Sequence, residues 1–276
     1  MLNLIKYSSL KLKDVEEPIV PQGPSFNQCG LIKHNLGGNC LQFRSPKHRP
    51  RNTYSKSIYE KRYKNMEFYT KLSNNLEMSD ESWRYRTIFM RTWSYNGSWF
   101  TGKVYQQSLH INILEPNQIN KKISFFHPRA FETTILQLLT SSYSHYDGCN
   151  ARIAPVNWKP LTQHPMPAVT FTVSIPMRRL DDTKQIVIIP FSNQHLIEFS
   201  FSYGGEFWNE SNLPDDELVS TQPLIELQND IINSIQLNLS PESQAQFDAV
   251  KAECPNMSLT DNFPPIDWSA TSNSKP

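Results

Sequence analysis

Regular alternation of apolar and polar side chains near residue 200 is the feature that most limits what this chain can fold into. Between residues 197 and 203 every second residue is isoleucine, phenylalanine or tyrosine, and Glu198 and two serines fill the positions between. This period places the apolar side chains on one face of a strand and the polar ones on the other. Segment 185–191 is apolar at nearly every position and rich in β-branched residues, which indicates a neighbouring strand covered on both faces.

The residues that join these two segments, SNQ at 192–194, have the side chains typical of a turn. The sequence therefore predicts a hairpin with strands at 185–191 and 195–203. His195 shares the parity of Ile197, at the turn end of the buried face. Because no acidic or nucleophilic partner lies at motif spacing, we expect His195 to be a packed or hydrogen-bonded residue and not a catalyst.

Other turn signals divide the rest of the chain into hairpins and helices. The Asn96–Gly97 pair is the strongest short hairpin signal and predicts strands at 84–95 and 98–114. A first hairpin is expected around residues 36–39, and a further strand at 168–175. Apolar residues at helical spacing predict helices at 55–77, 128–143 and 223–234, the first with one basic face. Ser240 and Pro241 match the cap and first position of a final helix, whereas the proline-rich stretch after residue 143 is expected to be a loop.

Strands joined by tight turns must be antiparallel neighbours, and helices between hairpins cover the faces of their sheet. The fold class predicted is therefore α+β, with an antiparallel sheet flanked by helices. We expect an extended N-terminal arm over 1–27, a single α+β domain over 28–253 and a loose C-terminal tail over 254–276.

The opening segment has no apolar run long enough for a secretory signal, and no later run approaches a membrane span. We therefore expect a cytoplasmic protein with no membrane partner. Cys29 and Cys40 bracket a predicted hairpin and are candidates for a disulfide in an oxidising compartment, whereas free thiols are expected in the cytoplasm.

Several runs of the chain resemble, in order, the elements of the Mog1, PsbP and DcrB type of domain. They are FETTILQLLTSS, IAPVNWKPL, MPAVTFTVSIP, QIVIIPFSNQHLIEFSFSYGG and PLIELQNDIINSIQLNLS. The likeness covers residues 83–240, and Ser234 and Ile235 stand where the closing helix of that family ends in a serine before a last apolar residue. The resemblance implies a Mog1/PsbP-like sandwich with binding roles and no shared catalytic residues.

No recognised catalytic, phosphate-binding or metal-binding motif is present in the sequence. We therefore predict no cofactor, no metal and no catalytic residue. Cys29, His34, Cys40 and His48 are metal-ligand types, but their spacing matches no usual zinc pattern. A hydrolase whose site is assembled from residues distant in sequence remains an alternative.

Two features are candidates for binding. The first is the aromatic cluster at the predicted Asn96–Gly97 hairpin tip, Trp93, Tyr95, Trp99 and Phe100, whose rings would anchor a partner protein unless they pack into the core. The second is the basic, tyrosine-containing segment 44–71, which would suit nucleic acid but equally a solvated helix face. The leading hypothesis is a non-catalytic protein-binding or accessory protein. A bacterial immunity-type protein that neutralises a toxin would fit by analogy of fold.

Overall fold

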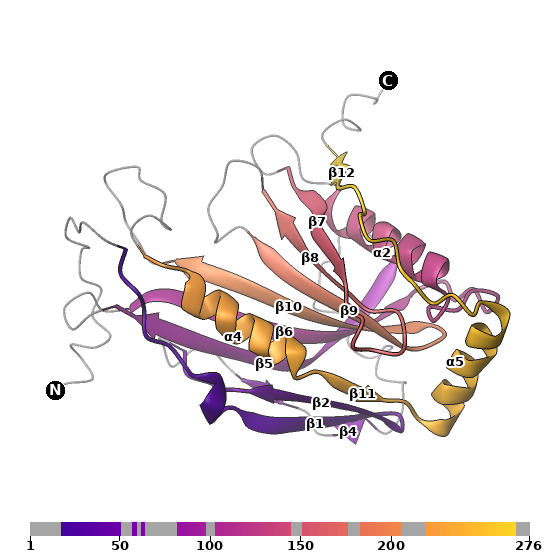
Figure 1. The fold of residues 1–276 in the computed structure, drawn as a ribbon, viewed down its shortest axis with the longest axis horizontal. Coiled ribbons are helices and arrows are strands. Elements are labelled where there is room, and N and C mark those ends of the chain that lie inside the picture. The colour runs from indigo at the N-terminus through magenta and orange to yellow at the C-terminus, as the bar shows by residue number, and fades with distance from the viewer. Residues whose placement is uncertain are drawn as a thin grey trace.

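The computed structural model describes residues 18–50, 57–59, 62–63, 82–97, 103–144, 151–175, 183–205 and 219–268. These residues form an eight-stranded sheet and a four-stranded sheet (Figure 1). In spatial order the large sheet contains β12 (Ile266–Asp267), β7 (Ile153–Pro160), β8 (Val169–Ser174), β9 (Lys184–Ser192), β10 (His195–Gly205), β6 (Lys103–Pro116), β5 (Trp83–Asn96) and β3 (Ile58–Tyr59). The small sheet contains β11 (Gln236–Asn238), β2 (Asn39–Ser45), β1 (Gly30–Leu36) and β4 (Arg62–Tyr63).

Helices lie between and after the strands of the second half of the described chain. They are α2 (Pro128–Tyr143), α4 (Gln222–Asn233) and α5 (Pro241–Glu253), and a short 3-10 helix, η1 (Phe26–Gln28), precedes β1. Proline stands in the first turn of all three α-helices, where backbone N–H groups have no partner within the helix, so its missing N–H costs no hydrogen bond. Ser240 caps α5 by accepting a hydrogen bond from the Ser243 N–H at 3.2 Å. The predicted helices at 128–143, 223–234 and after Ser240 are therefore confirmed.

The pairing of the large sheet is antiparallel throughout, which confirms the predicted α+β class. The β9–β10 hairpin pairs Ile189 with Ile197, and β6 pairs with β10 on its other side, with Ile113 opposite Ile197. Among the strand pairs of the described residues, only β1 and β4 run parallel, and they belong to the small sheet. All five predicted strands are present, although residues 98–102 lie outside the described residues.

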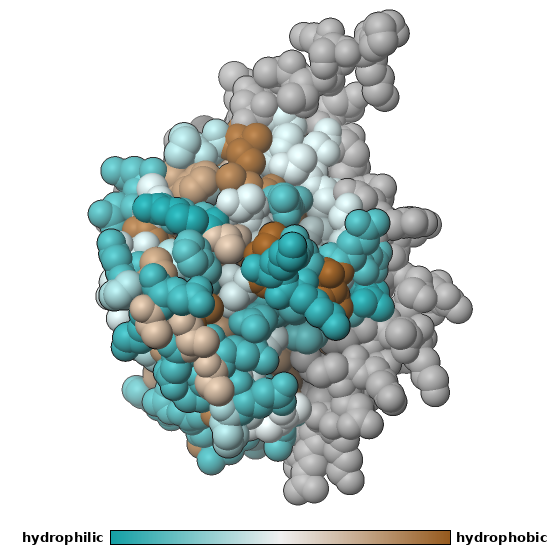
Figure 2. Space-filling view, turned by 90° about the vertical axis from the view of Figure 1, so that its right-hand side faces the viewer, coloured by the Kyte–Doolittle hydropathy of each residue, from teal (hydrophilic) through white to brown (hydrophobic). Residues whose placement is uncertain are grey.

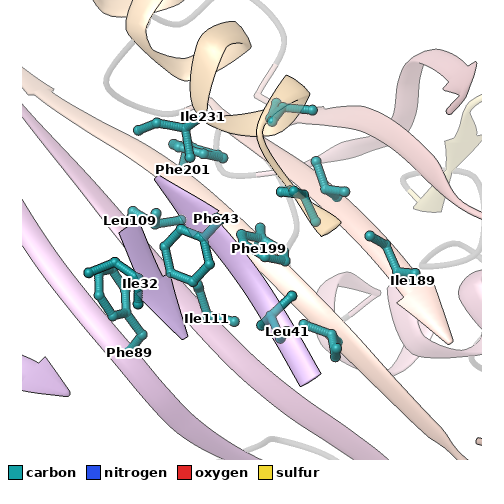
Figure 3. Close-up of a cluster of buried hydrophobic side chains, with 14 of the residues drawn as sticks. Ile32, Leu41, Phe43, Phe89, Leu109, Ile111, Ile189, Phe199, Phe201 and Ile231 are labelled. Carbon is teal, nitrogen blue, oxygen red and sulfur yellow. The ribbon is translucent and has the colours of Figure 1, made fainter. Parts of the chain in front are cut away.

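The large sheet buries both of its faces, against different elements. On one face lie the small sheet and α4, and Phe43 of β2 meets Phe199 of β10 with ring centroids 5.5 Å apart (Figure 3). On the opposite face, α2 covers one end of the sheet with Phe131, Ile135 and the leucines that follow. Consecutive residues of β9 point to opposite faces of the large sheet. Val187 packs in the hydrophobic cluster on the face covered by the small sheet and α4, and Ile188 packs in the cluster on the face covered by α2. This two-sided burial explains why segment 185–191 is apolar at nearly every position.

The structure corrects three expectations. Residues 58–59 and 62–63 are strands β3 and β4, not the start of a helix over 55–77, and the remainder of that range lies outside the described residues. The proline-rich stretch contains β7, which pairs with β8. The C-terminal segment is attached as far as residue 268, since β12 pairs with β7 and Trp268 is 3% exposed. In each case a distant partner supplies order that the local sequence does not indicate.

Cys29 and Cys40 are free thiols. In the register of the first hairpin, Cys40 pairs with Asn35, whereas Gly30, next to Cys29, pairs with Ser45 at the opposite end. The two cysteines therefore lie at different ends of the hairpin and do not meet across it. Burial raises the pKa of the Cys29 thiol to about 11, which disfavours its reactive thiolate form. Within the described ranges, no helix is both long enough and apolar enough to cross a membrane.

Candidate binding cleft beside α4

A cleft of about 610 Å³ lies between α4 and strands β7, β8, β9 and β10 of the large sheet. Ligand pockets typically have volumes of roughly 300–1,000 Å³. Strands β7 to β10 supply the floor and α4 supplies one wall. A second hollow, of about 820 Å³, lies between α2 and the paired ends of β5 and β6. The cleft beside α4 is the better candidate because its β7 side contains left-handed backbone at Asn157 and its α4 rim carries exposed amides.

Hydroxyl and amide side chains form the floor of the cleft. Thr170 and Thr172 occupy alternate positions of β8, on the face opposite the buried Val169, Phe171 and Val173. Gln185 of β9 joins the two threonines, since its Oε1 accepts from the Thr172 hydroxyl at 2.7 Å and its Nε2 donates to Thr170 Oγ1 at 2.6 Å. This network holds the floor rigid while leaving one N–H of the Gln185 amide for a ligand.

The α4 wall is polar on the side that faces the cleft. Its apolar residues Leu224, Leu227 and Ile231 are buried in the core, and this packing directs Gln228, Asn229 and Asn233 toward the cleft. Gln228 is fixed by a hydrogen bond from the Tyr203 hydroxyl. Burial raises the pKa of Tyr203, so the hydroxyl remains a neutral donor.

Asn229 and Asn233, by contrast, are exposed and form no side-chain hydrogen bond with any described residue. They therefore present both N–H donors and carbonyl acceptors at the rim of the cleft.

The β7 side of the cleft has irregular backbone. Asn157 has a φ of 54°, the left-handed conformation that asparagine tolerates better than most residues. The pairing of β7 with β8 shifts in register on both sides of Val156. Bulges and left-handed residues both occur preferentially near functional sites, where they redirect side chains. Here they place Asn157 and Lys159, both exposed, at the rim opposite α4.

The chemistry that the described lining of the cleft offers is mainly hydrogen bonding, and Lys159 and Tyr203 are its ionisable groups. The described residues that line it include amides, hydroxyls, one lysine and the apolar side chains of Leu161, Ile225 and Ile232. Within that lining there is no carboxylate, imidazole or thiol. The described part of the chain also contains no group of three histidine, cysteine, aspartate or glutamate side chains that could hold a metal ion.

The two described residues of the predicted aromatic site are buried. Trp93 and Tyr95 have no exposed surface, and they belong to the core cluster on the face of α4. Tyr95 donates its hydroxyl to Gln107 at 2.8 Å, and the Trp93 indole donates to the Pro46 carbonyl at 3.4 Å. Trp99 and Phe100 lie outside the described residues. Trp93 and Tyr95 are therefore corrected from candidate anchors to core residues.

His195 contacts a carboxylate and a hydroxyl, but in an arrangement that suits a structural role. Its Nδ1 lies 2.6 Å from Ser192 Oγ and its Nε2 lies 2.9 Å from Glu115 Oε2. Glu115 also pairs with Arg84, and Ser192 Oγ accepts the Gln194 N–H at 3.3 Å. The His195 and Glu115 side chains are only 16% and 7% exposed, and neither lines the cleft beside α4 or the hollow beside α2. The Ser192 hydroxyl is thus engaged in the turn that joins β9 to β10.

Two residues of the basic segment 44–71 form contacts within the protein, Arg44 through its side chain and Arg49 through its backbone. The Arg44 guanidinium donates to the Cys29 carbonyl at 3.1 Å and lies over the Phe26 ring. The backbone of Arg49 pairs with Thr92 and Ser94 of β5. Arg44 is therefore committed to internal contacts, while most of the segment lies outside the described residues.

Sequence reasoning missed the cleft residues because none belongs to a motif. A signal was nevertheless present in VTFTVS, where the positions opposite the buried residues carry two threonines, a pattern typical of a strand with one polar face. The partners Gln185, Asn229 and Asn233 come from other elements, and only the fold brings them together.

Comparison of the chain with protein-family models, with curated proteins and with solved structures finds no match. The likeness to the Mog1, PsbP and DcrB type of domain therefore stays a prediction. What the structure establishes is the α+β class with its large antiparallel sheet.

Proposed function

We propose that this protein is a non-catalytic binding protein and that the cleft beside α4 takes an extended segment of another protein. The observation that carries the proposal is the lining of the cleft, which combines unpaired rim amides with a hydroxyl floor and contains no described carboxylate, imidazole or thiol. A site of this composition binds by hydrogen bonds and shape, whereas hydrolysis needs a positioned base or nucleophile.

An extended peptide suits this lining in three ways. The amides of Asn157, Asn229 and Asn233 each offer a donor and an acceptor, the same pair that every peptide group presents. Ile225 and Ile232 of α4 offer apolar contact for side chains of the bound segment. Lys159 at the rim favours a segment that carries negative charge. A toxin that exposes such a segment would be one partner of this kind, in line with the immunity-type hypothesis.

Paired variants on α4 test the proposal. Asn229→Ala with Asn233→Ala removes the two rim amides, whereas Glu226→Ala with Asp230→Ala alters two exposed residues of the same helix that do not line the cleft. The partner is first captured from the native host with the wild-type protein and identified by mass spectrometry, and its Kd is then measured by titration calorimetry. We expect the asparagine pair to weaken binding about thirtyfold, from the loss of two hydrogen bonds of about 1 kcal/mol each.

The control pair should change the Kd less than about twofold. Both double variants should have the melting temperature of the wild-type protein. Equal partner affinities for the two double variants would show that the cleft is not the binding site.

A further inference from the structure

The loop between β6 and α2 exposes aliphatic and basic side chains together. Every residue from 117 to 123 is exposed, and Ile119 and Ile123 are 47% and 41% exposed, among the few large hydrophobic side chains at the surface of the described chain. Lys121 and Lys122 lie between them in sequence. Figure 2 shows the end of the molecule on the right of Figure 1, with hydrophobic surface on either side of hydrophilic atoms.

The local charge of this loop is entirely positive. The sequence contains no aspartate or glutamate between Glu115 and Glu132, and Arg129, which follows the two lysines, is paired with Glu132 at 2.7 Å. Glu242 and Glu253 of α5 line a groove next to Ser124, at the base of the loop. The tip of the loop, and not the whole end of the molecule, is therefore its cationic part.

The β9–β10 turn holds this loop in a fixed shape. Gln194 Nε2 donates to the carbonyls of Asn120 and Ile123, at 3.1 and 2.5 Å. Within the loop, the Ile123 N–H donates to the Asn120 carbonyl at 3.0 Å and the Lys122 N–H to Asn120 Oδ1 at 3.1 Å. The loop is thus ordered before any contact, so little conformational entropy is lost when its tip is bound.

We propose that loop 117–123 attaches the protein to an anionic lipid surface. The aliphatic side chains of Ile119 and Ile123 enter the boundary between headgroups and acyl chains, while Lys121 and Lys122 contact anionic headgroups. This differs from the expectation of no membrane partner, which rested on the absence of a spanning segment. Attachment to the surface of a membrane needs no such segment.

The composition and size of the loop favour a lipid surface over a protein partner. Protein interfaces are enriched in aromatic residues and arginine and depleted in lysine, whereas residues 117–123 contain two lysines and no aromatic residue. A single protruding turn is also far smaller than the roughly 800 Å² that each partner buries in a standard protein interface. Binding at a membrane surface strengthens with buried apolar area and with attraction to anionic lipids, and the loop supplies a part of each.

The loop is separate from the cleft beside α4. Gln194, which braces the loop, precedes β10, whereas Tyr203, which lines the cleft, lies near the other end of that strand. With a rise of about 3.3 Å per residue, the two positions are roughly 30 Å apart. The two surfaces can therefore be occupied together and tested independently.

Co-sedimentation with vesicles tests the proposal, using phosphatidylcholine vesicles with and without phosphatidylserine. We expect the wild-type protein to bind the phosphatidylserine vesicles more tightly and to be released at high salt. Lys121→Gln with Lys122→Gln should weaken binding about 25-fold, about fivefold for each lysine. Ile119→Ser with Ile123→Ser should weaken it about tenfold or more.

A matched control comes from the small sheet, where Leu31→Ser with Lys33→Gln changes an exposed leucine and an exposed lysine of β1. This control should bind as the wild-type protein does, and all variants should keep the wild-type melting temperature. The proposal is wrong if wild type fails to bind phosphatidylserine vesicles, or if the loop variants bind them as wild type does. An equal loss of vesicle binding in the control variant would also overturn the proposal. Loop variants that no longer bind an acidic protein partner but still bind vesicles would overturn it as well.

Discussion

His195 and Glu115 join β10 to β6 at the end of the sheet, with His195 Nε2 2.9 Å from Glu115 Oε2. Ser192 Oγ, on the other side of the imidazole, links this pair to the end of β9. Removing the ring leaves a buried carboxylate with one partner fewer. We therefore expect His195→Ala to lower the free energy of unfolding by about 1–3 kcal/mol in denaturant titrations.

His127→Ala is the control for this variant, because His127 precedes α2 without forming a side-chain cap. It should change stability by less than about 0.5 kcal/mol. We also expect no chemical step to depend on His195. A turnover assay in which His195→Ala is inactive but fully folded would contradict this structural assignment.

A variant of Trp93 provides the second prediction. A buried core residue should affect stability when it is truncated, whereas a binding residue should affect the affinity for the partner. Trp93→Ala creates a large cavity beneath the small sheet and should cost about 3–5 kcal/mol of stability. Its melting temperature should fall well below that of Tyr59→Ala, which truncates a ring that is 38% exposed. The folded fraction should still bind the captured partner normally. If Trp93→Ala melts as the wild-type protein does but no longer binds the partner, Trp93 belongs to the binding surface and not to the core.

Much of the fold could be predicted because local chemistry and tertiary contacts agree. The period of β10 and the Ser240 cap each predicted an element that the structure contains. The Asn96–Gly97 pair correctly predicted the β5–β6 hairpin but not its register, since Tyr95 pairs with Tyr105 and Asn96 with Lys103 instead of meeting across a two-residue turn. β7 was missed because Pro155 and Pro160 interrupt it and its register shifts twice, so that no simple period remains. Pairing with β8 and β12 overrides that local signal.

The aromatic cluster was misassigned for a different reason, which is coverage by a distant segment. Gln22 pairs with Asn96 through two backbone hydrogen bonds, and Gly23 lies so close to Tyr95 that an added Cβ would sit 2.1 Å from its ring. The spacing of aromatic residues predicts which face of a strand they share. It does not indicate that a segment some seventy residues earlier in the chain lies across that face.

Asn39 provides a third prediction, since it ties the first hairpin to the start of α5. Its Oδ1 accepts the Ser240 N–H at 2.9 Å, and its Nδ2 donates to the Leu36 carbonyl at 2.9 Å. Asn39→Ala leaves a buried donor and a buried acceptor without these bonds, so we expect a loss of about 2 kcal/mol by chemical denaturation. Asn238→Ala, at an exposed position of β11, should be nearly neutral. Equal stability of the two variants would argue against the tie.

Glu198 predicts a dependence of stability on pH. Burial raises the pKa of this carboxyl above its ordinary value of 4.5, even though Asn112 donates to it at 2.8 Å. The folded protein thus holds the proton more tightly than the unfolded chain, and stability is lost as the pH rises from 4.5 through the raised pKa. Glu198→Gln keeps an acceptor for Asn112 but cannot ionise, so its stability relative to wild type should increase across this window.

Denaturant titrations from about pH 4 to about pH 8 would measure this difference. Burial lowers the pKa of His110 from 6.5, so its contribution is lost as the pH falls and runs in the opposite direction. His110 is present in both proteins, and its contribution cancels in the comparison. Glu226→Gln, at an exposed position of α4, should give a curve parallel to wild type. A constant difference between wild type and Glu198→Gln at all pH values would contradict the prediction.

Asn157 tests whether the irregular backbone of β7 serves binding through its side chain. Its φ of 54° is accessible to glycine without strain, so relief of strain in Asn157→Gly should offset the greater entropy of the unfolded chain. The stability of Asn157→Gly should then stay within about 1 kcal/mol of wild type, whereas Asn157→Ala should lose about 1–2 kcal/mol because its Cβ is strained in this conformation.

The affinity for the captured partner separates the two roles of this residue. Both variants lack the amide at the rim of the cleft, so titration calorimetry should show both binding about five- to tenfold more weakly than wild type. Thermal melts on the same samples should rank Asn157→Gly above Asn157→Ala. If Asn157→Gly binds as tightly as the wild-type protein, the left-handed residue shapes the backbone of β7 without contacting the partner, and the rim amides that matter are those of α4.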